Sequence, residues 1–261
     1  MIKMKFSLVD GQRQEARPGL SGNCPICGHP MVAKCGDVRV WHWAHQGSHS
    51  CDHWWEKETE WHRAWKEVFP VNWQEVLHES ETGEKHIADV KTDRGWVIEF
   101  QHSYLNPEER RSRDSFYPKL IWVVDGTRRK RDRSQLINAW NEGMPVGANS
   151  LVRRIFSDDC ALLREWVGSN APTFFDLGEL DVLWWLFAKS TSGSVYVGPF
   201  PRAVFIESHR GGATQESARA FDDFVNTFPK QLAEYESLVA KRPIQGFQRY
   251  SVPRIGRRRR F

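Results

Sequence analysis

The sequence predicts an α/β protein whose core consists of a helix, three strands, a second helix and a fourth strand. A small module rich in cysteine and histidine precedes this core, and an α+β extension follows it. Four of the five cysteines and five of the ten histidines precede residue 54, and the apolar residues after it change between helical and strand spacing. The 261 residues, 40% of them hydrophobic, suffice for a full core. We therefore place the boundaries at 1–53, 54–126 and 127–261.

Composition excludes several classes of protein. Charged residues make up 27% of the chain, which argues against a disordered, collagen-like or disulfide-stapled protein. No apolar run approaches the roughly 20 residues that span a bilayer, and the N-terminus shows no secretory signal. We expect a cytoplasmic protein without a membrane partner. In that reducing setting, cysteines serve as metal ligands or plain thiols.

The N-terminal module carries a zinc-binding pattern. Cys24 and Cys27 are separated by two residues, which lets both thiolates reach one ion from a tight turn. His42 and His45 offer two imidazoles downstream. Three further residues compete for a ligand position: Cys35, Cys51 and His53. We expect a closed, structural Zn²⁺ site, and the alternative is a reduced thiol pair or redox motif without metal.

Residues 54–69 are predicted to form the first helix of the core. Its apolar side chains recur at helical spacing, at Trp54, Trp61, Trp65 and Val68. Ser50 or Asp52 can cap the start of this helix, and Pro70 ends it.

Glu58 is the unusual residue of this predicted helix because it falls within the apolar stripe. A carboxylate on a buried face is costly unless a partner compensates it. His62 and Lys66 follow Glu58 at four-residue steps, so the three side chains are expected to share one edge of the helix.

Three strands follow the helix, at 73–77, 86–90 and 96–101. A hairpin turn between the last two places opposite each other residues whose numbers sum to about 188, so that Asp89 faces Glu99. Like charges in that position are destabilising, and a Mg²⁺ ion bound by both carboxylates, with waters and phosphate oxygens, resolves the conflict. The alternative is that one carboxylate points to solvent or pairs with Lys91 or Arg94.

The remaining elements are predicted from turn and capping signals. Asn106 and Pro107 start the second core helix, and 120–124 form a short buried strand. In the extension, 128–133 are interpreted as a charged connector. Further strands are expected at 173–177, 183–189, 195–197 and 203–206, followed by a helix at 216–241 that is interrupted near Pro229.

The C-terminal segment is strongly basic, although the net charge of the whole chain is only +4. Residues 241–261 contain eight Lys or Arg and no Asp or Glu. Such a block favours contact with a nucleic-acid backbone, DNA or RNA, and the alternative is a solvated chain end.

Several of these motifs, in this order, resemble the competence-protein CoiA-like family. They are Cys24-x-x-Cys27, His42-Trp43-Ala44-His45, Glu58-Thr59-x-x-His62-x-x-x-Lys66, His86-Ile87-Ala88-Asp89-Val90, Ile98-Glu99-Phe100-Gln101-x-Ser103, Arg113-x-x-x-Tyr117 and Ile121-Trp122-Val123-Val124. The resemblance covers residues 5–125 well and 170–206 more loosely.

The resemblance implies a PD-(D/E)xK, restriction-endonuclease-like core and hydrolysis of DNA phosphodiester bonds with Mg²⁺ or Mn²⁺. It implies catalytic roles for Glu58, Asp89, Glu99 and Gln101. Asp89, Glu99 and the carbonyl of Phe100 would hold the Mg²⁺, and Glu58 would bind it through a water or help to bind a second ion. Gln101 stands where many members of the superfamily carry Lys, and it can orient a water but supplies no charge. His62 and Lys66 are further candidates for phosphate contacts.

Two other functions fit the same residues. The protein could be a non-cleaving DNA-binding factor with an inactive nuclease fold and a zinc ribbon, because fold alone does not establish activity. It could also be an adaptor that binds protein partners in a DNA-processing assembly, for competence, recombination or defence. Metal-dependent nicking of DNA distinguishes the nuclease from both alternatives.

Overall fold

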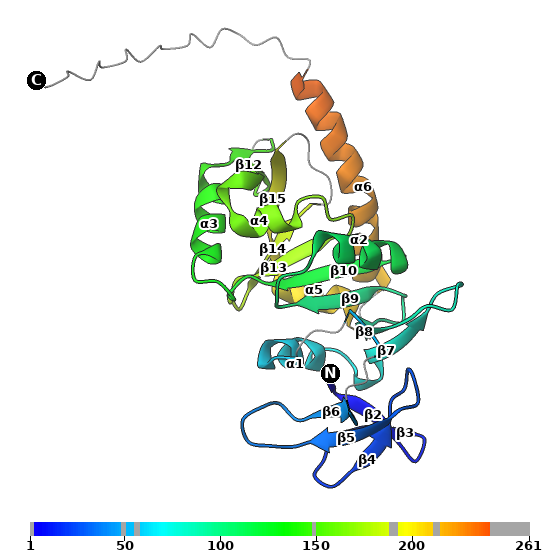
Figure 1. The fold of residues 1–261 in the computed structure, drawn as a ribbon. Helices are drawn as coiled ribbons and strands as arrows, with labels where there is room; N and C mark the ends of the chain where they lie inside the picture. The colour runs from blue at the N-terminus through cyan, green and yellow to red at the C-terminus, as the bar shows by residue number, and fades with distance from the viewer. Residues whose placement is uncertain are drawn as a thin grey trace, which may run out of the picture.

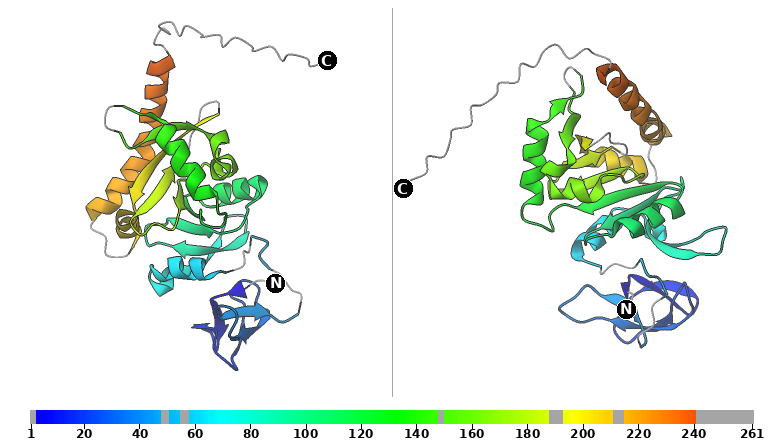
Figure 2. Two further views of the ribbon diagram at one scale, coloured as in Figure 1. Left: turned by 90° about the vertical axis from the view of Figure 1, so that its left-hand side faces the viewer. Right: turned by 45° about the horizontal axis from the view of Figure 1, so that its top comes forward.

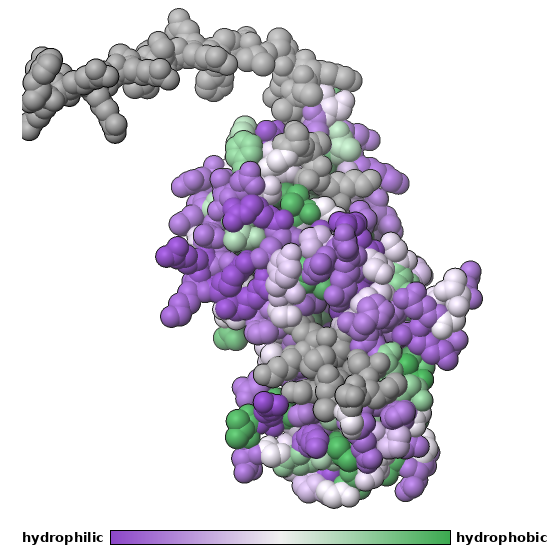
Figure 3. All heavy atoms as spheres, viewed as in Figure 1, coloured by the Kyte–Doolittle hydropathy of each residue, from purple (hydrophilic) through white to green (hydrophobic). Residues whose placement is uncertain are grey.

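A computed structural model describes residues 3–47, 51–54, 58–147, 150–187, 193–210 and 215–240. The protein is a mixed α/β structure with two separate sheets, one of six strands and one of nine (Figure 1). Figure 2 shows the six-stranded sheet at one end of the molecule, with α6 extending away from it at the other. Hydrophilic side chains cover most of the face of the larger unit that Figure 3 presents. None of the described helices is both long enough and apolar enough to cross a membrane.

The six-stranded sheet is antiparallel throughout and has the strand order β1-β6-β5-β4-β2-β3. Its strands are β1 Lys3–Met4, β2 Phe6–Val9, β3 Gln12–Glu15, β4 Ser21–Asn23, β5 Pro30–Lys34 and β6 His42–His45. Its buried apolar cluster is small and centres on Met31 and Trp43. A unit with so little core needs a further staple, such as a bound metal.

The nine-stranded sheet has the order β11-β12-β15-β14-β13-β10-β9-β8-β7. Its strands are β7 Gln74–Glu79, β8 Lys85–Lys91, β9 Val97–Gln101, β10 Leu120–Asp125, β11 Met144–Pro145, β12 Arg153–Phe156, β13 Thr173–Asp176, β14 Val182–Leu186 and β15 Ser194–Pro201. The central strands β9, β10 and β13 are parallel, and the flanking pairs are antiparallel.

Helices cover both faces of the large sheet. They are α1 Glu60–Glu67, α2 Pro107–Phe116, α3 Asp132–Glu142, α4 Ala161–Trp166, α5 Arg202–His209 and α6 Gln215–Ala240, with short 3₁₀ turns at Val71–Trp73 and Ser157–Asp159. Alternate residues of β10 enter opposite cores: Trp122 packs with residues of α3 and α4, and Ile121 packs with residues of α1, α5 and α6. A strand buried on both faces is expected to be apolar, as β10 is from Leu120 to Val124.

The order of helix, three strands, helix and strand is confirmed for the region from α1 to β10. The predicted start of the first helix was wrong. Thr59 caps α1 through a capping box with His62, whose backbone N–H donates to the Thr59 hydroxyl, so Glu58 lies before the helix rather than on it. Of the two expected caps, Asp52 lies upstream of α1 and Ser50 lies outside the described residues.

The extension was predicted only in part. Strands near 173–177, 183–189 and 195–197 are confirmed as β13, β14 and β15, but the predicted strand at 203–206 is instead part of α5. Its four apolar residues fit either periodicity, and packing of Phe205 into the core decides for a helix. Helix α6 continues through Pro229, so the predicted interruption was wrong. Helices α3 and α4 were not predicted from the sequence. The basic segment 241–261 lies outside the described residues.

The expected boundary between 126 and 127 does not separate two sheets. Strand β10 lies before that boundary and β13 after it, and the two pair in parallel from Trp122 and Thr173 to Asp125 and Asp176. The core and the extension therefore share one continuous sheet.

Candidate functional site

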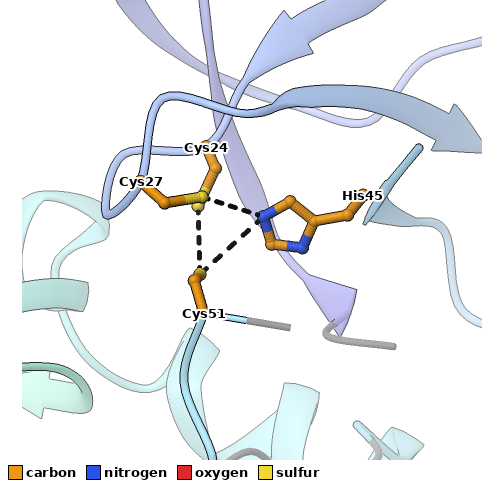
Figure 4. Close-up of side chains that lie close together, drawn as sticks. All are labelled: Cys24, Cys27, His45 and Cys51. Carbon is orange, nitrogen blue, oxygen red and sulfur yellow. Dashed lines mark hydrogen bonds between the residues drawn. The ribbon is translucent and has the colours of Figure 1, made fainter. Parts of the chain in front are cut away.

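Four side chains of the N-terminal unit, which comprises the six-stranded sheet and residues 51–53, converge on one point (Figure 4). They are Cys24, Cys27, His45 and Cys51, and their ligand atoms all lie within 4.8 Å of one another. Cys24 and Cys27 lie on the turn between β4 and β5, where Gly28 has a φ of +71° and its N–H donates to the Cys24 carbonyl. His45 ends β6, and Cys51 follows it.

The donor set fits a structural zinc ion. With Zn–S bonds of about 2.3 Å, the edge of a regular tetrahedron is about 3.8 Å. The Cys24 and Cys51 sulfurs are 3.6 Å apart, and His45 Nε2 lies 3.4 Å from Cys27 Sγ and 3.8 Å from Cys51 Sγ. Burial raises the pKa of the Cys24 and Cys51 thiols, so a cation is needed to hold them as thiolates. A Cys₃His cluster of this kind could hold one Zn²⁺, with no open position for catalysis.

His42 does not belong to this cluster, contrary to the sequence prediction, and Cys51 takes the fourth place. Residues three apart on a strand point to opposite faces, so β6 cannot direct both His42 and His45 to one ion. The Nδ1–H of His42 instead donates to the Val40 carbonyl at 2.8 Å. Of the other competitors, Cys35 and His53 also lie outside the cluster.

A second concentration of polar groups lines a cavity between the two sheets. Five acidic residues line it, namely Asp52, Glu58, Glu75, Asp89 and Glu99, together with Lys66, His62 and Arg113. Met4 and Ile26 of the N-terminal unit form part of its wall. The volume that the centres of water molecules can occupy in this cavity is about 70 Å³. A single water needs roughly 10–15 Å³ by the same measure. The cavity can therefore hold several waters or a hydrated cation.

Asp89 and Glu99 meet in this cavity at the point where β8 and β9 separate. The paired register ends with Lys91 opposite Val97 and Val90 opposite Ile98, which is the register predicted from the sequence. Beyond this pair, hydrogen bonds between backbone N–H groups and carboxylates connect the two strands. The Phe100 N–H donates to Asp89 Oδ2 at 2.9 Å, and the Asp89 N–H lies 3.4 Å from Glu99 Oε1. The carboxylates of Asp89 and Glu99 are thus held close together where the pairing of β8 and β9 ends.

The two carboxylates differ in their environment. Glu99 is 5% exposed, and burial together with the charge of Asp89 raises its pKa to about 8. Arg113 opposes this shift, because its Nη1 donates to Glu99 Oε2 at 3.2 Å. The Asp89 side chain is 24% exposed. The raised pKa favours the protonated form of Glu99 near pH 7, which reduces the repulsion that the sequence predicted.

Glu58 reaches the cavity from the segment before α1 and is almost completely buried. Its carboxylate contacts Arg63 at 2.5 Å and Lys66 at 2.6 Å. These two cations outweigh the cost of burial and lower the pKa of Glu58. The pairing required for a buried carboxylate is thus provided locally, although Glu58 is not on a helix.

Phe100 and His62 line the cavity, whereas Gln101 does not. The Nε2–H of His62 donates to the Phe100 carbonyl at 2.7 Å, so this carbonyl, expected as a metal ligand, already accepts one hydrogen bond and keeps one lone pair. Gln101 is buried and donates to the Ser103 carbonyl at 3.2 Å. It is not among the described residues that line the cavity.

Sequence reasoning missed two residues of the site, Glu75 and Asp52. Glu75 adopts a φ of +47° and accepts hydrogen bonds from the backbone N–H groups of Lys5 and Phe6. Asp52, next to Cys51, accepts from His86 Nδ1 at 2.9 Å and from the Ile87 N–H at 3.2 Å. Both contacts join the N-terminal unit to the core over distances that no local pattern reveals. A positive φ outside glycine was the one feature that marks Glu75, and it is visible only in the structure.

Within the described residues, only the cysteine–histidine cluster brings three or more metal-ligating atoms within 4.8 Å of one another. The carboxylates of the cavity are not gathered that closely. A divalent cation would find Asp89 and Glu99 side by side, and Glu58 would have to approach them.

Comparison with known proteins agrees with the N-terminal assignment. Residues 16–53 match the family model of the competence protein CoiA, N-terminal domain. All four residues of the zinc-type cluster lie inside this matched segment. No curated protein and no solved structure matches the chain.

Proposed function

We propose that this protein is a Mg²⁺-dependent nuclease that hydrolyses DNA phosphodiester bonds in a competence-related process. The observation that carries the proposal is the meeting of Asp89 and Glu99 where β8 and β9 separate, inside a cavity that Glu58 also lines. The order of elements from α1 to β10 agrees with a PD-(D/E)xK core. The CoiA N-terminal match of residues 16–53 supports a role in competence.

The residues of the cavity fit a hard divalent cation, because Mg²⁺ prefers carboxylate oxygens and retained waters. Asp89 and Glu99 would hold it, and the free lone pair of the Phe100 carbonyl is a further donor. Glu58 lines the same cavity and would contribute through a water. When bound, such an ion polarises a phosphoryl oxygen and lowers the pKa of a water. The buried His62 fixes the Phe100 carbonyl through its hydrogen bond.

The zinc-type cluster has a structural part in this proposal. It closes a sheet with a small core, and that sheet contributes Met4 and Ile26 to the wall of the cavity. The basic residues of 241–261 would add contacts to the phosphate backbone.

The decisive test is incubation of the purified, zinc-loaded protein with plasmid and with linear DNA. Mg²⁺ or Mn²⁺ is added to one set and withheld from the other, since a strong chelator would also remove zinc. We expect nicks or shortened strands only with the added ion. Asp89→Asn is the matched control, because the amide oxygen can still accept the Phe100 N–H while the charge is lost. Equal cleavage by this variant would move the activity away from the cavity.

A non-cleaving DNA-binding protein is the second candidate, and the position of Gln101 favours it. The Gln101 side chain is bonded to the Ser103 carbonyl rather than directed at the carboxylates. In this case the protein would retain DNA with a strong salt dependence while leaving both DNA substrates intact under every metal condition.

A further inference from the structure

Lys66 places an ammonium group among the carboxylates of the cavity. Its side chain is 4% exposed, and its Nζ lies 2.6 Å from Glu58 Oε1, 2.8 Å from Glu75 Oε1 and 3.9 Å from Asp89 Oδ1. These oxygens belong to three separate segments of the chain: the segment before α1, the start of β7 and the middle of β8. One cation therefore contacts three acidic groups at once.

The neighbours of Lys66 favour its charged form. Burial alone would lower the pKa of a lysine, but the neighbouring carboxylates of Glu75 and Glu58 outweigh it and raise the pKa. The Lys66 ammonium contacts the carboxylate oxygens of Glu58 and Asp89, which a metal ion would also bind, so the two cations compete for them.

Glu75 is a partner of Lys66 that is not proposed as a metal ligand. Both Glu75 oxygens accept backbone N–H groups from the start of the N-terminal unit, at 2.9 Å and 2.8 Å from Lys5 N and, for Oε2, 3.2 Å from Phe6 N. This carboxylate is therefore held against the N-terminal unit. It also lines the cavity, together with Glu58 and Asp89.

We propose that Lys66 is the resident counter-ion of the metal site: it balances Glu58 and Asp89 when no divalent cation is bound, and it withdraws to Glu75 when one enters. The inference rests on the proposed function, because it takes the cavity to be a metal site. It makes Lys66 a positioning residue and Glu75 the anchor that keeps the ammonium close by after displacement. The N-terminal unit thereby influences metal affinity without supplying a ligand.

The test is the affinity of the full-length, zinc-loaded protein for Mn²⁺, measured by titration calorimetry without DNA. Lys66→Met removes the competing charge, so Mn²⁺ should bind more tightly by roughly tenfold or more, as expected for a unit charge a few ångströms away in a screened site. Glu75→Gln removes the alternative partner, so Lys66 should hold Glu58 and Asp89 more firmly and Mn²⁺ should bind severalfold more weakly. Lys85→Met is the control, since it removes a lysine of β8 whose partner is the surface residue Glu79, and it should change the affinity less than about twofold.

A melting experiment provides a second reading. Lys66→Met should melt at a lower temperature than the wild type without Mn²⁺, because Glu75 and Asp89 lose this cation and Glu58 keeps only Arg63. Saturating Mn²⁺ should raise the melting temperature of Lys66→Met more than that of the wild type. If Lys66→Met does not fold, the weaker binding of Glu75→Gln carries the test alone.

The outcomes separate the inference from the proposed function. Wild-type binding with equal or weaker binding by Lys66→Met, or tighter binding by Glu75→Gln, would overturn the inference and leave the metal site standing. Binding by Lys66→Met but not by the wild type would support it. Absence of binding by every variant would overturn both.

Discussion

Glu99→Gln is the substitution for which the structure gives the most definite expectation. The pKa of Glu99 is raised from 4.5 to about 8 by burial and by Asp89. The folded protein therefore binds a proton that the unfolded chain has already released between these two values. Stability must then fall as the pH rises through this window, since stability declines wherever the native state holds more protons.

The magnitude follows from the same shift. Each unit of pKa difference corresponds to about 1.4 kcal/mol, so the wild type should lose about 3 kcal/mol relative to Glu99→Gln between about pH 5.5 and about pH 7.5. Gln cannot ionise, and its amide oxygen can still accept from Arg113, so the variant lacks this dependence and should be the more stable protein at high pH.

The assay is urea unfolding of both proteins at several pH values, with zinc retained and no other divalent ion added. Comparison of the two proteins cancels groups that both contain, such as His86, whose pKa is also raised. A difference in unfolding free energy that stays constant with pH would refute the reasoning. It would mean that Arg113 keeps Glu99 ionised in the folded protein. Addition of Mn²⁺ should reduce the loss in the wild type, because metal ligands bind in the deprotonated form.

Two further predictions concern the metal ligands. Asp89→Asn should abolish metal-dependent DNA cleavage while the melting temperature without Mg²⁺ stays unchanged or rises, because the repulsion with Glu99 is removed; a variant that cleaves normally would exclude Asp89 from the active site. Cys51→Ser should lower bound zinc well below one per chain and destabilise the fold, whereas His42→Ala should keep the zinc and lose roughly 1 to 2 kcal/mol through its broken hydrogen bond. Elemental analysis of both purified variants checks this, and loss of zinc from His42→Ala alone would restore the ligand set expected from the sequence.

Local patterns in the sequence predicted the core well. The turn between β8 and β9 fixed the register that brings Asp89 to Glu99, because strand pairing in a short hairpin depends only on the turn. Helix α2 begins where Asn106 and Pro107 predicted it. Both results depend on neighbours in the sequence, which is the information that spacing contains.

Contacts over long sequence distances could not be predicted in this way. Glu75 binds Lys5 across 70 residues, and Cys51 rather than His42 completes the cluster because β6 turns its two histidines to opposite faces. The same limit explains α3. The charged run before it resembles a connector, yet Asp132 is buried and pairs with Arg129, so tertiary packing overrides the local composition.

The central position of β10 has a consequence for how the protein is made. Its residues Leu120–Asp125 are buried along the whole strand, and β9 and β13 pair with its two edges. During synthesis, β10 emerges well before β13, which begins at Thr173. Until then the nascent chain presents an apolar strand with one unpaired edge, a surface prone to association with other chains. The residues that line the cavity with Asp89 and Glu99 all lie between Met4 and Arg113, yet the sheet that supports them is complete only after β13 and the later strands have been translated.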